Sequence, residues 1–109
     1  MNAAMSMRQS DFEGSIVIVG EEETLPYERP PLSKEWLKSD VEPNVPLVCR
    51  RDILEDRHIT FQGGAVVTSI SPEKHQIALS SGQLLDYDAL LLSTGGRARP
   101  LPIEGAEYA

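Results

Sequence analysis

The most constraining feature of this sequence is the stretch 15–38, SIVIVGEEETLPYERPPLSKEWLK, in which an apolar run leads through an acidic pair into a proline-rich turn. The run IVIV at residues 16–19 has no polar residue, a pattern typical of a parallel strand covered on both faces. Because parallel sheets bind ligands beyond the carboxyl ends of their strands, Glu21 and Glu22 stand at a candidate binding edge. An exposed acidic loop is the alternative interpretation of this pair.

The proline-rich turn places two cations close behind the acidic pair. Prolines before and after Arg29 restrict the backbone φ angles, so a stiff, extended segment presents its side chain. Ser33 is a candidate N-cap of a short helix whose first turn contains Lys34. Solvent-exposed charges are the alternative for both cations, but the stiffened turn favours a binding role.

A second glycine-containing strand end is predicted later in the chain. Three runs at residues 65–71, 75–80 and 84–87, separated by turn residues, predict an antiparallel meander. The apolar run ALLLS at residues 89–93 predicts another buried strand, and Thr94-Gly95-Gly96 follows it. Glycines directly after a parallel strand allow a ligand to approach the backbone closely, because no Cβ intervenes.

The remaining elements are predicted to support the sheet. Residues 1–9 predict a helix, residues 51–57 a second helix with Ile53 and Leu54 facing inward, and residues 59–62 a strand. The single cysteine, Cys49, has no partner for an internal disulfide and no zinc-binding motif around it. We expect it to pack as a small apolar residue.

Composition limits the class of protein. A chain of 109 residues allows one small domain, and a net charge of −7 argues against nucleic acid or an anionic membrane as a partner. The sequence has no apolar run long enough to span a bilayer, and its N-terminus lacks the apolar core of a signal peptide. We therefore expect a cytoplasmic protein, whereas the sequence does not indicate an oligomeric state.

The run PYERPPLSKEWL directly after IVIVGEE resembles the FAD-binding segment of flavin-dependent ferredoxin reductases, the group of rubredoxin, putidaredoxin and apoptosis-inducing-factor-like reductases. The resemblance implies FAD contacts from Glu21, Glu22, Arg29 and Lys34. No metal ligand and no catalytic residue is implied. Other flavoenzymes of this superfamily carry a redox-active cysteine pair in this region, so a thiol relay is disfavoured.

Two further segments resemble the same family. The meander is similar to the family's crossover between two parallel strands, which implies an adenine contact from Val66 or Val67; plain strand packing is the alternative for both valines. The run STGGRARPLPIEG resembles the family's ATG motif and implies FAD contacts from Thr94, Gly95 and Arg99.

The resemblance implies an α/β fold: part of a three-layer, Rossmann-like FAD-binding domain, with parallel strands and an antiparallel meander as crossover. Within it, residues 1–14 would be a helix remnant and connection, 15–99 the core, and 100–109 a linker toward an NAD-binding domain. No G-x-G-x-x-G motif occurs, so the first strand and its glycine turn are expected to be missing. That strand would lie between residues 16–19 and 89–93, leaving an unpaired edge on each.

The implied function is that of a fragment of an FAD-dependent NAD(P)H:ferredoxin-type oxidoreductase, which passes electrons from NAD(P)H through FAD to an iron-sulfur or rubredoxin partner. We expect weak or no FAD affinity from the isolated chain, which would be inactive alone, because the main pyrophosphate-binding turn is absent. The alternative is a non-catalytic remnant, or a complementing module that docks with another chain.

Overall fold

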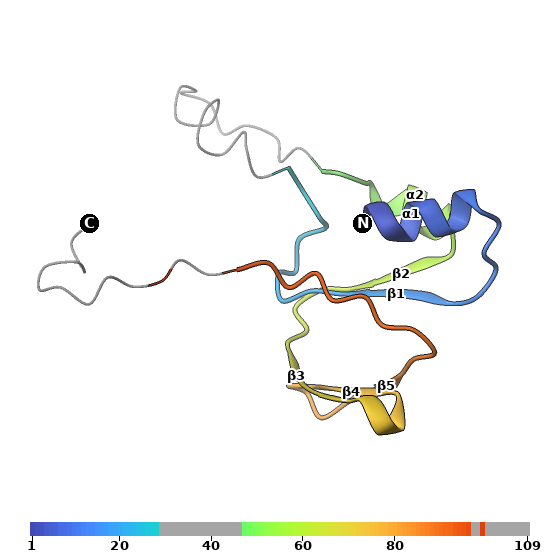
Figure 1. The fold of residues 1–109 in the computed structure, drawn as a ribbon. Helices are drawn as coiled ribbons and strands as arrows, with labels where there is room; N and C mark the ends of the chain where they lie inside the picture. The colour runs from blue at the N-terminus through green and yellow to red at the C-terminus, as the bar shows by residue number, and fades with distance from the viewer. Residues whose placement is uncertain (29–46, 97–98, 100–109) are drawn as a thin grey trace, which may run out of the picture.

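The structure, a computed structural model, describes residues 1–28, 47–96 and 99, and they form three layers (Figure 1). The middle layer is a two-stranded parallel sheet of β1 (Ile16–Val19) and β2 (Ile59–Gln62). Helices α1 (Asn2–Gln9) and α2 (Arg51–Asp56) cover one face of this sheet. The expected helix after Ser33 lies outside the described residues.

The third layer, on the side of the parallel sheet away from the helices, is an antiparallel meander. Its strands are β3 (Val67–Ser71), β4 (Gln76–Leu79) and β5 (Leu84–Asp86), with the 3-10 turn η3 (Pro72–Lys74) between the first two. All three predicted strands are present, each slightly shorter than expected. The expected α/β class, with parallel strands and an antiparallel meander, is confirmed.

The parallel pair shows the alternation of side chains that a strand imposes. Ile16 pairs with Ile59 and Val19 with Gln62, so each strand places every second residue against the helices. Ile16 is buried, but Val17 is 49% exposed. The expectation that β1 is covered on both faces is therefore wrong at Val17. An apolar run indicates a strand, but it does not show whether another layer packs on the second face of that strand.

The core lies between the helices and the parallel sheet. It is formed by buried residues from α1, β1, the loop segments, α2 and β2: Ala4, Ile16, Leu25, Cys49, Leu54 and Ile59. Burial of Cys49 confirms its expected packing role. The expectation for α2 is only half right, because Leu54 is 2% exposed whereas Ile53 is 38% exposed. Neighbouring residues of a helix point in directions about 100° apart, so a short helix with one buried side cannot bury both.

The side chain of Arg8, near the end of α1, forms hydrogen bonds to the turn between α2 and β2. Its Nε donates to the carbonyl of Arg57 at 2.7 Å and its Nη2 to the carbonyl of His58 at 2.9 Å. Its Nη1 donates to the carbonyl of Phe12, which follows α1. These contacts hold α1 on the same face of the sheet as α2.

Residues 89–93, expected to be a buried strand, are not a strand and are exposed throughout. Leu91 is 69% exposed and Leu92 is 62% exposed. The physical reason is that the two sheets of the described chain contain only β1–β2 and β3–β5, and neither offers these residues a neighbouring strand. An apolar run without a strand beside it has no partner for its backbone groups and cannot form a ladder.

No helix in the described ranges is long and apolar enough to cross a membrane.

Candidate functional site

The carboxyl ends of β1 and β2 meet at one edge of the parallel sheet. The N–H of Gly20, directly after β1, donates to the carbonyl of Gln62, the last residue of β2, at 3.1 Å. Glu21, Glu22 and Glu23, here called the acid loop, follow Gly20 and are all exposed. The predicted acidic pair therefore lies at the sheet edge where parallel α/β folds bind their ligands.

The backbone after β2 determines the path of the acid loop. The N–H of Gly64 donates to the carbonyl of Glu22 at 3.2 Å, and the N–H of Ala65 to the carbonyl of Gly20 at 2.9 Å. A Cβ atom on Gly63 would lie 2.9 Å from the carbonyl oxygen of Glu23 and 3.0 Å from that of Glu22. Glycine at position 63 thus permits a contact between the two loops that any side chain would disrupt.

Tyr27 orients one carboxylate of the acid loop. Its hydroxyl donates to Oε2 of Glu22 at 2.8 Å. The backbone on both sides is fixed, because Tyr27 forms an isolated antiparallel bridge with Leu47 and the N–H of Val48 donates to the carbonyl of Pro26 at 2.8 Å. Tyr27 is not among the predicted site residues, although it lies beside a proline and five residues after Glu22 in the sequence.

The start of the meander directly follows Gly64 and Ala65, whose backbone N–H groups bond to the acid loop and to Gly20 before it. Val66 follows the bonded pair Gly64 and Ala65, and its carbonyl accepts from the N–H of Ser80 at 2.8 Å. Val66 is 40% exposed and Val67, the first residue of β3, is 41% exposed. The backbone bonds of Gly64 and Ala65 thus bring the acid loop and the start of the meander, with the partly exposed Val66, to one edge of the parallel sheet.

A side-chain hydrogen bond joins the strand ends to the meander. Nε2 of Gln62, at the end of β2, donates to Oε1 of Gln83 at 2.8 Å. Gln83 lies in the turn between β4 and β5, and its carbonyl accepts from the N–H of Leu79 at 2.9 Å. The meander is therefore tied to the same edge of the parallel sheet that carries the acid loop.

Among the described residues, no contact that the structure records brings Thr94, Gly95 or Arg99 to the acid loop. Thr94 and Gly95 are exposed, and within the described ranges no hydrogen bond joins them to the loop. Gly95 has a φ of 67°, a left-handed conformation that favours glycine, and a Cβ there would touch nothing within 4 Å. Arg99 is exposed, while Arg29 and Lys34 lie outside the described residues.

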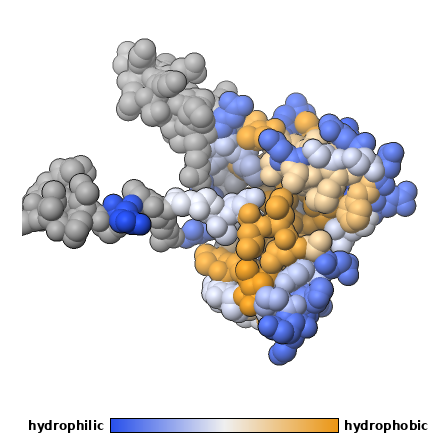
Figure 2. All heavy atoms as spheres, viewed as in Figure 1, coloured by the Kyte–Doolittle hydropathy of each residue, from blue (hydrophilic) through white to orange (hydrophobic). Residues whose placement is uncertain are grey.

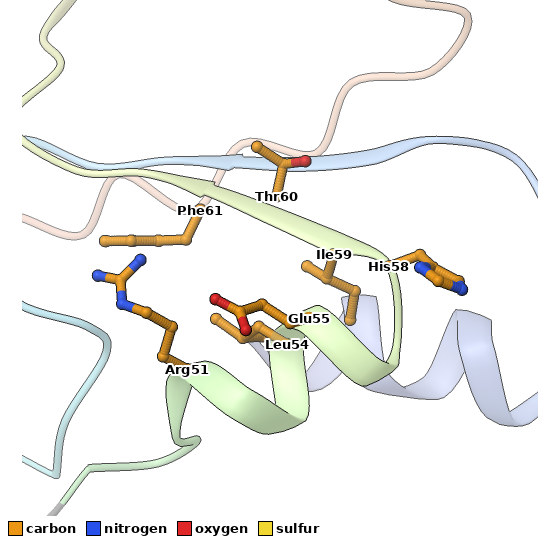
Figure 3. A pocket seen from close by; sticks show the side chains of 7 residues that line it. All are labelled: Arg51, Leu54, Glu55, His58, Ile59, Thr60 and Phe61. Carbon is orange, nitrogen blue, oxygen red and sulfur yellow. The ribbon is translucent and has the colours of Figure 1, made fainter.

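A separate hollow of about 500 Å³ lies between α2 and β2 (Figure 3). Figure 3 shows the side chains of Arg51, Leu54 and Glu55 rising from α2 toward Ile59 and Phe61 of β2. None of the predicted site residues lines this hollow. Its walls are the flank of one helix and one strand, so the acid loop is the better candidate site, because there two strand ends and a loop converge.

The described residues contain no group of three or more His, Cys, Asp or Glu side chains arranged to hold a metal ion.

Comparison with known proteins matches the whole chain to one family. The family model for pyridine nucleotide-disulphide oxidoreductases matches residues 1–109. Putidaredoxin reductase CamA of Pseudomonas putida is 39% identical over 103 residues, which cover 94% of this chain and 24% of that protein. Rhodocoxin reductase of Rhodococcus erythropolis is 38% identical over 104 residues, which cover 95% of this chain and 24% of that protein.

Solved structures give the same result. The chain is similar to the crystal structure of the covalent putidaredoxin reductase–putidaredoxin complex, with a TM-score of 0.84 and 39% identity over 94% of this chain and 24% of that chain. It is also similar to NADH:rubredoxin oxidoreductase from Clostridium acetobutylicum, with a TM-score of 0.71 and 27% identity over 82% of this chain and 23% of that chain. The chain spans about a quarter of the length of the curated relatives it matches.

Proposed function

The chain belongs to the pyridine nucleotide-disulphide oxidoreductase family, and we propose that it forms one wall of the FAD site in a ferredoxin-type NAD(P)H oxidoreductase. The observation that carries this proposal is the acid loop, which the backbone of Gly64 and Ala65 holds at the carboxyl edge of β1 and β2. The names of the relatives support the reaction class, because they include putidaredoxin and rhodocoxin reductases and a ferredoxin–NAD(+) reductase component.

The residues at this edge fit the adenosine half of FAD. Ribose hydroxyls donate hydrogen bonds that carboxylates accept, and Glu21 and Glu22 supply carboxylates on an exposed, backbone-fixed loop. Tyr27 donates to Oε2 of Glu22 and so orients this carboxylate, which we propose as an acceptor for a ribose hydroxyl. Val66, with Val67 beside it, offers apolar surface for an adenine ring.

The other half of the cofactor is assigned to the remaining predicted residues. Arg29, Lys34 and Arg99 are the cations proposed to face the pyrophosphate and the flavin, and Thr94 with Gly95 offers backbone that a ring can approach closely. Bound FAD would take a hydride from NAD(P)H and pass its electrons on to an iron-sulfur or rubredoxin partner. The residues of this chain bind and orient the cofactor.

A thiol relay is not part of the proposal, although the family name includes disulphide chemistry. These 109 residues contain one cysteine, and Cys49 is buried in the core. An internal dithiol–disulfide cycle needs two cysteines within reach of each other. This favours direct transfer from FAD to a protein acceptor, in a cytoplasmic enzyme.

The test is a chimera in which this chain replaces the matching quarter of Pseudomonas putida putidaredoxin reductase. We expect the chimera to retain FAD, measured by flavin absorbance after gel filtration, and to reduce putidaredoxin. Changing both Glu21→Gln and Glu22→Gln should weaken FAD binding about tenfold, because two charge-assisted acceptors are lost. Glu73→Gln, in the exposed turn η3, is the matched control and should leave FAD binding unchanged.

Two outcomes would overturn the proposal. The first is a chimera that folds, as judged by circular dichroism, but retains no FAD. The second is an equal FAD affinity for the acid-loop variant and the Glu73→Gln control. Titration of FAD into the isolated chain gives a further check, because weak or no binding is expected from a chain that contributes only one wall of the site.

A second candidate function is a complementing module that docks with another polypeptide. The exposure of Leu91 and Leu92 favours this function, because neighbouring large apolar side chains at a surface often mark a contact with another protein. The two candidates differ in one measurable property: only the first requires FAD affinity in the chimera.

A further inference from the structure

The edge of β2 that faces away from β1 carries backbone groups without a strand partner in the described chain. The carbonyl of Gln62 points to β1, where it accepts from the N–H of Gly20 at 3.1 Å. Because the direction of the backbone groups alternates along a strand, Thr60 also points to β1, whereas Ile59 and Phe61 point outward. The described strands form only the pairs β1–β2, β3–β4 and β4–β5, so none of them meets the outward groups of β2.

The hollow of about 500 Å³ between α2 and β2 leaves room above this edge. Residues of β2 line it and residues of β1 do not, so it lies on the side of β2 away from β1. A strand added beside β2 would lie about 4.8 Å away, and two neighbouring helices need axes about 8–10 Å apart. A second chain with its own helix on this face therefore needs free space of this kind.

The two charged side chains of α2 that line the hollow have opposite signs. Arg51 and Glu55 are four residues apart, about one helical turn, so they share one flank of α2. Figure 3 shows both side chains turned toward β2. Within the described ranges, no ion pair involves either of them. Such a flank complements itself across a two-fold axis, because each residue of one copy can meet the opposite charge of the other.

We propose that two copies of this chain associate through the outer edges of β2, antiparallel to each other and related by a two-fold axis. Ile59 of each copy forms a hydrogen-bonded pair with Phe61 of the other, which places the axis between the two Thr60 residues. The two β1–β2 sheets then become one continuous sheet with all helices on the same face. The α2 helices run antiparallel, so Arg51 of each copy faces Glu55 of the other.

A second copy is the occupant because it supplies the matching charges by symmetry, whereas a different protein would need to carry the same pattern. Apolar surface elsewhere offers a competing contact. Figure 2 shows apolar atoms gathered where Figure 1 draws the chain after β5, with hydrophilic atoms around the helices. Leu91 and Leu92 of that segment are 69% and 62% exposed. Association through these leucines would not respond to the charges at positions 51 and 55. The proposal does not depend on FAD binding.

The test is sedimentation equilibrium of the full 109-residue chain over a range of concentrations, where we expect a monomer–dimer equilibrium. Arg51→Glu and Glu55→Lys should each weaken the dimer about tenfold, because each change replaces two attractions across the axis with two repulsions. Lys74→Glu and Glu73→Lys, in the exposed turn η3, change the net charge by the same amounts outside the proposed interface. These matched controls should leave the equilibrium unchanged.

Two combinations of the charge variants should restore the dimer. The double variant Arg51→Glu/Glu55→Lys exchanges the two charges and recovers the attraction across the axis. An equimolar mixture of the two single variants should form a heterodimer, because one carries only anions and the other only cations at these two positions. A variant that had simply lost its structure would show neither recovery.

A cysteine cross-link tests the register of the two strands. Thr60→Cys should give a disulfide-linked dimer with oxidised glutathione, because the Cα atoms of a non-hydrogen-bonded antiparallel pair are about 4.5 Å apart, within disulfide range. Leu84→Cys on β5, at a residue 57% exposed, should give far less linked dimer. Cys49 is buried and is kept in both variants.

Several results would overturn the proposal. They are a monomer at every concentration up to the solubility limit, an association that Arg51→Glu and Glu55→Lys leave unchanged, no recovery in either combination, and equal cross-linking at positions 60 and 84. If the variants fail to fold, as judged by circular dichroism, amide hydrogen exchange of the unaltered chain decides. Protection of Ile59 and Phe61 that rises with protein concentration supports the proposal, and its absence contradicts it.

Discussion

Two apolar parts of this molecule have similar composition and different surroundings. Ile16, Leu54 and Ile59 lie between the helices and the parallel sheet and are each less than 10% exposed. Residues 89–93 are at least as apolar in sequence, yet Leu91 and Leu92 are more than 60% exposed. The difference shows that an apolar run contains side chains that favour burial. Whether they are buried depends on whether another element of the fold packs against them.

The sharpest test of this comparison is a pair of leucine truncations. Leu54→Ala should lower the free energy of unfolding by about 3 kcal/mol, because Leu54 is 2% exposed and its removal leaves a cavity in the core. Leu92→Ala, at a residue 62% exposed, should change it by less than about 0.5 kcal/mol. Urea denaturation followed by circular dichroism measures both, and equal losses would show that residues 89–93 are buried in solution.

A glycine pair compares the acid-loop edge with the segment after residue 93. Gly63→Ala should destabilise the protein by about 2 kcal/mol, because its Cβ would press on Phe61 and on the carbonyls of Glu22 and Glu23. Gly96→Ala is the control, since a Cβ there meets nothing within 4 Å. Thermal unfolding of the two variants gives the result. A neutral Gly63→Ala would mean that the loops separate easily.

An arginine pair tests how firmly α1 is held against α2. Arg8→Ala removes the donors to Arg57, His58 and Phe12 and should cost about 1 kcal/mol, a modest value because the contacts are exposed. Arg57→Ala is matched to it, because Arg57 contributes its backbone carbonyl and not its side chain to this contact. Hydrogen exchange in α1 should speed up in Arg8→Ala only; equal rates in both variants would contradict the role of Arg8.

The smallest expected effect belongs to an exposed ion pair at the start of α2. The hydrogen bond from Arg50 holds the pKa of the Asp52 carboxyl below its ordinary value of 3.8. A depressed pKa in the folded state means that the pair contributes stability above the unfolded pKa and loses it as the pH falls through the folded pKa. NMR titration should show the Asp52 pKa rising in Arg50→Gln. An unchanged pKa would show that the pair does not form in solution, as is common for exposed ion pairs.

Local pattern was enough to predict most elements of the fold. The helices α1 and α2, the strands β1 and β2 and the meander all follow from periodicity and turn residues within short windows. The prediction of a strand at residues 89–93 was wrong because a strand needs a neighbouring strand to pair with. A short sequence window does not show whether such a neighbour exists. The predictions that Val17 and Ile53 are buried were wrong for a related reason. The sequence pattern identifies the strand or helix but not how many of its sides are covered by other elements.

The candidate site was predicted in its residue types more than in its geometry. Glu21, Glu22 and Val66 meet at one edge because two parallel strands end there, which follows from the sequence once the strands are paired. The bond between Tyr27 and Glu22 and the contact of Gly63 with the acid loop were not predicted, because they depend on the register of segments far apart in sequence. The cofactor-binding roles of all the predicted site residues stay predictions: Glu21, Glu22, Arg29, Lys34, Val66, Val67, Thr94, Gly95 and Arg99.

The backbone bonds that shape the acid loop also bear on how this protein can change. Gly64 and Ala65 hold the carbonyls of Glu22 and Gly20, and neither bond involves a carboxylate. These two backbone bonds can therefore form whichever side chains occupy positions 21 and 22. In redesign, we expect that these two positions can be changed to alter the ligand, whereas Gly63 must be kept because a Cβ there would press on the carbonyls of Glu22 and Glu23.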